Sequence, residues 1–252
     1  MSLFCRREID QRRCVSRVGR AFDTKREEDM RSTTKISALT ALVAACGIAG
    51  VSQAALTFSF ADPVPGRQMS YSQGTGLISY DNLAAITVLV DGSTEPISFS
   101  TAFPNSTMTM SLAVGTVSVA GPVIQAPVAG FFELRDASSA LIIRGDTANG
   151  SFIRLGSTSS ILMSDDISFA YTAGPSLTAL LVPGRALANP QEAVFTVTDL
   201  LVGGGGPLVV DGQMRSWTAN ASYSGNSEVV PAPGAIALAS LGGLLIARRK
   251  RA

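Results

Sequence analysis

Residues 55–228 are predicted to form an all-β domain, a single β-sandwich or jelly roll of roughly eight to twelve strands. Three observations predict this fold. Apolar and polar residues alternate over short segments, turn-forming residues interrupt the apolar runs about every ten residues, and no uninterrupted amphipathic helical pattern is present. Any helix within the domain is therefore expected to be short.

Three segments show the alternation of a half-buried strand, in which every second side chain faces the core. They are residues 56–60, 97–100 and 193–198. Two denser apolar runs, residues 84–90 and 141–143, favour strands that are buried on both faces. The dipeptides Asp91-Gly92 and Asp211-Gly212 are predicted to form turns.

Charge is distributed very unevenly along the chain. Of the 20 Lys and Arg residues, ten lie at or before Lys35 and four form the run 248–251. Residues 55–228 keep six Arg against thirteen Asp and Glu, a net charge of −7 without any lysine. Because nucleic-acid affinity rests on Lys and Arg displacing counterions from phosphates, we exclude nucleic acid as a partner.

The residue types that most enzymes use are missing from this segment. The chain has no histidine, and its cysteines, Cys5, Cys14 and Cys46, all precede Ala55. Histidine-containing triads, zinc sites and disulfides are therefore not expected in residues 55–228, and without lysine a Ser-Lys pair is also excluded. We expect no enzymatic activity, no cofactor and no metal site.

Residues 30–54 have the three parts of a signal peptide. Arg31 and Lys35 supply positive charge, residues 36–51 are largely apolar, and Ser52-Gln53-Ala54 matches a small-x-small cleavage sequence. Cleavage is predicted between Ala54 and Ala55. As an alternative, residues 43–46 resemble a lipobox, in which a cysteine becomes lipidated.

Residues 1–29 are interpreted as an N-terminal extension that is either mis-annotated or disordered. A charged stretch of this length does not normally precede a signal peptide. Arg26-Glu27-Glu28 can be encoded by purine-rich codons that would form a ribosome-binding sequence upstream of Met30. Translation is then expected to start at Met30.

Residues 229–252 combine a short proline motif, an apolar run and a basic end. The motif is Pro231-Ala232-Pro233, the run covers residues 235–247, and the end is Arg248, Arg249, Lys250 and Arg251. Residues 229–247 would span ~28 Å as a helix, close to the ~30 Å hydrocarbon core, and the basic end is expected to stay cytoplasmic. We expect a transient membrane insertion.

This order of features resembles the PEP-CTERM sorting tail, with alanine at position 232 where that family usually has glutamate. The resemblance covers about the last twenty-five residues and implies that an exosortase-like enzyme processes the chain near the proline motif. It also implies an exported protein that passes through the inner membrane to the cell envelope or the exterior, and extracellular polysaccharide as a partner. The all-β domain is then flanked by an N-terminal signal helix and a C-terminal hydrophobic helix.

The domain itself leaves several binding chemistries open. Asp165-Asp166 beside Ser164, and Asp146 beside Asn149, offer oxygen ligands of the kind calcium prefers, although no EF-hand spacing accompanies them. Paired carboxylates are sufficient for glycoside hydrolysis. The aromatic residues are assigned mainly to the core, with a sugar-stacking platform as the alternative; they are Trp217, Tyr71, Tyr80, Tyr171 and Tyr223.

The leading interpretation is a structural or adhesive protein of the envelope or extracellular matrix. A carbohydrate-binding module of the cell surface is the second interpretation, and a carboxylate-dependent glycosidase is the third. Because β-sandwiches host all three classes, the fold alone does not choose among them.

Overall fold

The structure, a computed structural model, describes residues 54–61 and 66–232. The described residues belong to a single compact unit. The predicted extension 1–29, most of the signal peptide, Pro233, the apolar run 235–247 and the basic end 248–251 lie outside the described residues.

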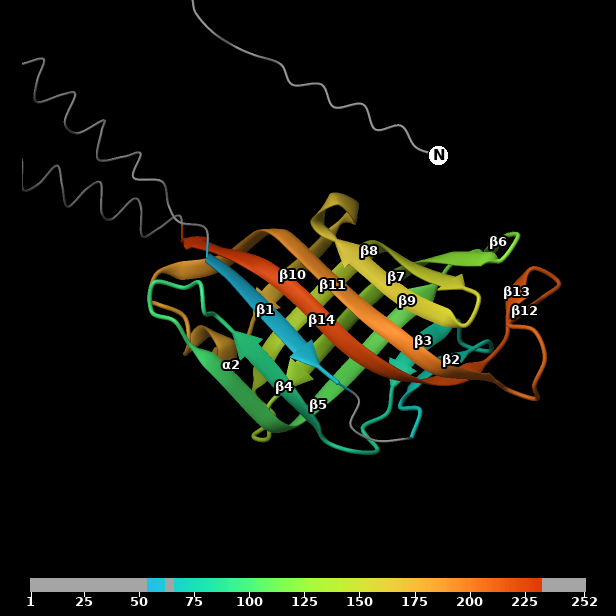
Figure 1. The fold of residues 1–252 in the computed structure, drawn as a ribbon, viewed down its shortest axis with the longest axis horizontal. Helices are drawn as coiled ribbons and strands as arrows, with labels where there is room; N and C mark the ends of the chain where they lie inside the picture. The colour runs from blue at the N-terminus through green and yellow to red at the C-terminus, as the bar shows by residue number, and fades with distance from the viewer. Residues whose placement is uncertain (1–53, 62–65, 233–252) are drawn as a thin grey trace, which may run out of the picture. The chain divides into compact units, whose positions relative to one another are not determined.

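The described residues form an antiparallel β structure with very little helix (Figure 1). Its strands are β1 (Ala54–Phe60), β2 (Met69–Ser72), β3 (Leu77–Tyr80), β4 (Ile86–Asp91), β5 (Ser100–Val114), β6 (Ser118–Ala120), β7 (Val123–Arg135), β8 (Leu141–Leu155), β9 (Thr158–Ser164), β10 (Phe169–Ala173), β11 (Arg185–Val202), β12 (Val209–Val210), β13 (Gln213–Met214) and β14 (Trp217–Pro231). Its helices are the 3-10 turn η2 (Asp165–Ile167) and α2 (Pro175–Thr178), both short as predicted.

The strand pairings close on themselves. The order β1-β4-β5-β7-β8-β9-β11-β14 leads back to β1, because β14 pairs with both β11 and β1. Strands β2 and β3 fill the space between β14 and β5, while β10 pairs with the first half of β8. This large antiparallel sheet has twelve strands within the described residues, and β12 and β13 form a separate hairpin.

Two layers of strands enclose the core. Figure 1 shows β1, β14, β11 and β9 crossing in front of β5, β7 and β8. Side chains from both layers meet between them, since the ring of Phe132 on β7 lies 5.0 Å from that of Phe195 on β11 and 5.3 Å from that of Tyr223 on β14, measured between centroids. The architecture is consistent with the predicted β-sandwich.

The alternation of apolar and polar residues gives these strands one buried and one more exposed face, as predicted. In β1, Leu56, Phe58 and Phe60 are buried, whereas Thr57 is exposed. Within the predicted segment 193–198 of β11 the buried side chains are again every second residue, at positions 193, 195 and 197. Each side chain of this kind adds about 1.5–3 kcal/mol to folding when fully buried.

Two strand predictions were wrong in detail. The predicted strand over residues 97–100 is mostly part of the turn between β4 and β5, which begins only at Ser100, and Ile97 is 70% exposed. Pro96 lacks an N–H for pairing just before it. The run 84–90 is buried on one face only, because Thr87 and Leu89 of β4 point outward. In contrast, Ile142 and Ile143 are both buried, and the register shift beside them explains how adjacent side chains can face inward.

Both predicted turns contain the expected residues. Asp211 and Gly212 connect β12 to β13, and both have positive φ, 50° and 74°, as a type I′ hairpin turn requires. Asp91 ends β4, and Gly92 begins the longer turn that leads to β5.

No helix in the part of the chain that the structure describes is both long enough and apolar enough to cross a bilayer.

Candidate functional site

Ala54 and Ala55 of the predicted cleavage site lie at the same end of the domain as Pro231 and Ala232 of the proline motif. Strand β1 runs antiparallel to β14, with Ala54 opposite Val229 and Ala55 opposite Glu228 (Figure 1). The first residues of the domain therefore lie beside its last residues, although almost the whole domain separates them in the sequence. We call this region, made of residues 54–55, 94–95, 184–185 and 228–232, the terminal end.

Ala55 is fixed on its other side by Thr94. The backbone N–H of Ala55 donates to Thr94 Oγ1 over 2.8 Å, and the hydroxyl of Thr94 donates to the carbonyl of Ala55 over 2.9 Å. Since Thr94 belongs to the turn between β4 and β5, the residue that follows the predicted cleavage bond is held from two directions. Sequence reasoning missed Thr94, because no local pattern relates it to Ala55.

The proline motif begins within the sheet. Pro231 is opposite Arg185 of β11, and the N–H of Ala232 donates to the carbonyl of Gly184 over 2.6 Å. Residues 229–231, which the sequence analysis assigned to the sorting tail, are thus the last residues of β14. Proline has no N–H to donate, which fits its position where the strand ends.

A buried ion pair lies beneath this end. Arg185 Nε is 3.3 Å from Glu95 Oε2, and Arg185 Nη2 donates to the carbonyl of Val229 over 2.6 Å. The Glu95 side chain is only 1% exposed. Burial raises the pKa of Glu95 because it disfavours the charged carboxylate, and the nearby charge of Arg185 opposes that rise. Neither residue could be singled out from the sequence, since a buried acid leaves no local signal.

The aromatic residues belong to the core, as the sequence analysis mainly assigned them. Trp217 is 2% exposed, and the tyrosines at positions 71, 80, 171 and 223 are buried as well. The ring of Trp217 stacks between Tyr71 and Phe152, and its indole N–H donates to the sulfur of Met214. The alternative of a sugar-stacking platform built from these residues is therefore wrong.

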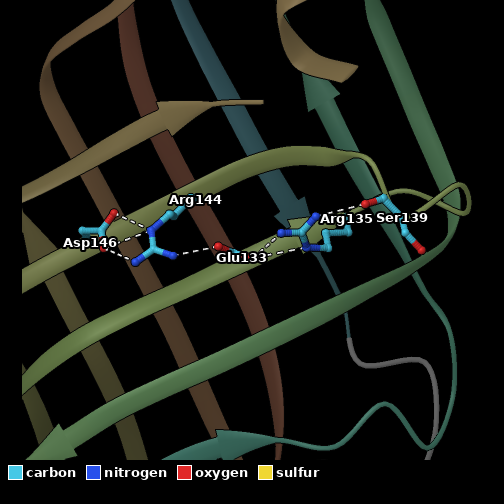
Figure 2. A network of polar contacts seen from close by, with 5 residues as sticks. All are labelled: Glu133, Arg135, Ser139, Arg144 and Asp146. Carbon is cyan, nitrogen blue, oxygen red and sulfur yellow. Dashed lines mark hydrogen bonds and ion pairs between the residues drawn. The ribbon is translucent and has the colours of Figure 1, made fainter. Parts of the chain in front are cut away.

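A polar network crosses the outer face of strands β7 and β8 (Figure 2). Arg144 lies between two carboxylates, with Nη1 2.7 Å from Glu133 Oε1 and Nη2 2.7 Å from Asp146 Oδ1. Glu133 also accepts from Arg135 over 2.7 Å, and the guanidinium carbon of Arg144 lies 4.0 Å from the ring centroid of Phe131. The two acids are thus joined by a cation instead of facing an open space between them.

The ionisation of this network follows from its partners. Burial alone would raise the pKa of Glu133, but the hydrogen bonds and charges of Arg135 and Arg144 outweigh it and lower that pKa. Hydrogen bonds to Asp146 and then to Glu133 raise the pKa of Arg144. The Glu133 carboxylate is thus held in the charged form, which is unsuited to a general acid near neutral pH.

The candidate calcium ligands are not gathered into one site. Asp165 and Asp166 lie in η2, while Asp146 is occupied by Arg144. Among residues 54–61 and 66–232, no group of three His, Cys, Asp or Glu side chains lies close enough to hold a metal ion.

The glycine run 203–206 forms a loop. The backbone carbonyls of Gly203 and Gly205 accept hydrogen bonds from the Arg215 side chain.

Two shallow hollows mark the surface. One, of about 460 Å³, is apolar and lies over Phe60 and Leu89. The other, of about 510 Å³, is polar and lies at the opposite end of β14 from Pro231; it includes Gln73, Thr116 and Gln213. Asp211 is the single carboxylate residue of the second hollow, and the first has none. Neither hollow holds the pair of acids that a glycosidase requires.

Comparisons with models of protein families, with curated proteins and with solved structures gave no significant match.

Proposed function

We propose that this chain is an exported structural or adhesive protein of the cell envelope or extracellular matrix. In this proposal, residues 30–54 form a signal helix, and residues 229–252 form a sorting tail with a hydrophobic helix that an exosortase-like enzyme reads. The inner membrane is a transient partner, and extracellular polysaccharide is the surrounding material. The domain 55–228 has no catalytic role.

The observation that supports this proposal best is the pairing of Ala54 with Val229. A signal helix and a sorting tail would both insert into the inner membrane, so the folded domain must present both of its ends to the same surface. If the two termini emerged at opposite ends of the domain, one terminal segment would have to run along the whole domain to reach the same membrane surface. The terminal end supports the proposal, because it brings residues 54–55 and 228–232 together.

Composition supports the absence of catalysis. Residues 55–228 lack histidine, cysteine and lysine, which removes the usual nucleophile and base combinations. The carboxylates of Glu133 and Asp146 are bridged by Arg144, which argues against the glycosidase interpretation. A structural role requires only a stable fold and the correct cellular location.

Export and sorting are tested by expressing the full chain with an epitope tag in the turn at Gly121, in hosts with and without an exosortase-like enzyme. Mass spectrometry of the product is expected to find Ala55 at the N-terminus in both hosts. Loss of the basic end, with cleavage near Pro231, is expected only where the enzyme is present. A chain that keeps residues 30–54 and stays in the cytoplasm would overturn the proposal.

Three variants identify the signals. Ala54→Phe is expected to block removal of residues 30–54, because the cleavage site requires a small residue. Replacing Arg248, Arg249, Lys250 and Arg251 by serine is expected to abolish retention of the tail on the cytoplasmic side. Asp166→Asn, a change on an exposed residue of η2, is the matched control and should leave both events unchanged.

The polar hollow favours carbohydrate binding as a second function. Amide and hydroxyl side chains at Gln73, Thr116 and Gln213 are the groups that hydrogen-bond sugar hydroxyls, and they lie far along β14 from the terminal end. A glycan array probed with the wild-type chain and with Gln213→Ala tests this role. Because Trp217 is buried, a substitution there would report only on stability. If Gln213→Ala leaves glycan binding intact, the polar hollow is excluded as the binding site.

A further inference from the structure

The cleavage that the proposed function requires would create a charge at the terminal end. Hydrolysis of the Ala54–Ala55 peptide bond by a signal peptidase consumes one water molecule, leaves a carboxylate on Ala54 and gives Ala55 an α-amino group. That group has an ordinary pKa of about 7.7–8.0, so it is largely protonated at pH 7. One amide donor becomes an ammonium with three N–H bonds. The pairing of Ala54 with Val229 is lost at the same time.

One acceptor for this ammonium is already in place. The nitrogen of Ala55 lies 2.8 Å from Thr94 Oγ1, on the edge of β1 that faces away from β14. The hydroxyl of Thr94 can keep accepting a hydrogen bond from the ammonium while it donates to the carbonyl of Ala55. Two N–H bonds of the ammonium then require new partners.

Glu228 lies where a second acceptor is needed. It is directly opposite Ala55 in the β1–β14 pairing, and side chains opposite each other have Cβ atoms about 4.5–5.5 Å apart. Residues on either side of Glu228, Ser227 and Val229, are buried, so the Glu228 side chain is on the outer face together with that of Ala55. Its Oε2 atom is shielded from solvent and makes no hydrogen bond within the part of the chain that the structure describes.

The surrounding charges favour a cation here. Charged groups on the strands and turns around Ala55 are Glu228 on β14, Asp91 at the end of β4, Glu95 in the turn that follows β4, and Arg185 on β11. These are three carboxylates against one guanidinium, and that guanidinium is already engaged by Glu95 and by the carbonyl of Val229. An ammonium on Ala55 would reduce this excess of negative charge.

We propose that Thr94 and Glu228 form a receptor for the α-ammonium group of Ala55, which signal cleavage exposes. The hydroxyl of Thr94 and the carboxylate of Glu228 both accept hydrogen bonds from the ammonium, and this contact replaces the lost pairing of Ala54. Cleavage at Ala54 thus stabilises the closing contact between the first and the last strand. This inference rests on the cleavage site in the proposed function.

The test compares the chain 55–252 with a free α-amino group and with that group acetylated, each with Glu228 and with Glu228→Gln. The protein is released from an N-terminal fusion so that Ala55 is its first residue, and it is kept in mild detergent because of its apolar tail. Lys250 is its single lysine, and lysine side chains ordinarily have a pKa about two units above that of an α-amino group, so acetylation near pH 7 is selective. Urea unfolding gives the unfolding constant of each form.

Acetylation is expected to raise the unfolding constant about two- to five-fold when Glu228 is present, the effect of a partly exposed ion pair. In Glu228→Gln the effect should disappear, while in the control Asp166→Asn it should persist. The α-amino pKa, read from the pH dependence of the acetylation rate, should be higher with Glu228 than in Glu228→Gln. An acetylation effect that is absent, or equal in both backgrounds, overturns the inference. An exported chain that starts elsewhere overturns the cleavage site instead, which mass spectrometry shows separately.

Discussion

The hydroxyl oxygens of Tyr171 on β10 and Tyr223 on β14 lie 2.6 Å apart in the core. Tyr171 donates its proton to the carbonyl of Glu192 over 2.7 Å, so the hydrogen bond between the two tyrosines is donated by Tyr223. Burial raises the pKa of both hydroxyls, which keeps them neutral. This chain of bonds connects β14, β10 and β11 inside the sandwich.

Removal of the two hydroxyls should therefore have unequal effects. Tyr223→Phe deletes a donor and leaves the bond from Tyr171 to Glu192 intact, so a loss of about 0.5–1.5 kcal/mol in unfolding free energy is expected. Tyr171→Phe leaves the Tyr223 hydroxyl and the Glu192 carbonyl without their partner and should cost about 1–3 kcal/mol. Urea denaturation of both variants and of the double variant measures the difference. An equal loss in both single variants would contradict the assigned donor direction.

Gly130 should tolerate no side chain. Its φ is 142°, and a Cβ atom at this position would collide with the carbonyl oxygen of Ser111 on β5. Gly130→Ala is expected to cost about 3 kcal/mol or more, from strain together with displacement of β5. Gly121 also has a positive φ, 58°, but faces open space, so Gly121→Ala should cost only about 1–2 kcal/mol. Thermal unfolding of Gly130→Ala and Gly121→Ala separates the stability lost through the steric collision from the stability lost through the positive φ.

Asp136 should make the turn between β7 and β8 sensitive to acid. Hydrogen bonds from the hydroxyls of Ser138 and Ser176 lower the pKa of Asp136 to about 2. A folded-state pKa below the unfolded value gives stability that is present above about pH 4 and is lost as the pH falls toward 2. Asp136→Asn is expected to flatten the fall in unfolding free energy over this window. An unchanged pH profile would show that these bonds do not persist in solution.

Arg185→Met should show how much unfolding free energy is lost when Glu95 is buried without a cation beside it. Without the guanidinium the carboxylate has no neutralising partner, and a loss of about 3–5 kcal/mol is expected at pH 7. Because the folded-state pKa of Glu95 is raised, the protonated form is favoured in the folded state, and the loss should shrink as the pH falls toward 4. The double variant Glu95→Gln with Arg185→Met should regain part of the stability at pH 7. Arg135→Met, on the exposed face, is the control for loss of one positive charge.

Periodicity in the sequence was enough to predict the fold class and several strands. Segments such as β1 and β11 carry their own signal, because the alternation of Phe58 with Thr57, or of Phe195 with Thr196, is local. The segment around Ile97 shows the limit of this reasoning. It alternates equally well, yet Pro96 and the turn between β4 and β5 decide its conformation.

The contacts of the terminal end could not be predicted in the same way. The hydrogen bonds between Thr94 and Ala55, and the ion pair between Glu95 and Arg185, join residues that are 39 and 90 positions apart. No pattern within a single strand contains that information. Processing near Ala55 and Pro231 stays a prediction from the sequence, and the structure adds that these two residues belong to strands that run side by side.

The pairing of β1 with β14 also has a kinetic consequence. It is a contact of very high sequence separation, and closing so long a loop is entropically costly and slows folding. Under the proposed export, the ring of strands would be completed only after the last strand has left the translocation machinery. A chain tethered to one membrane through both ends would have its two edge segments held near each other, which lowers this entropic barrier and favours closure at the membrane surface.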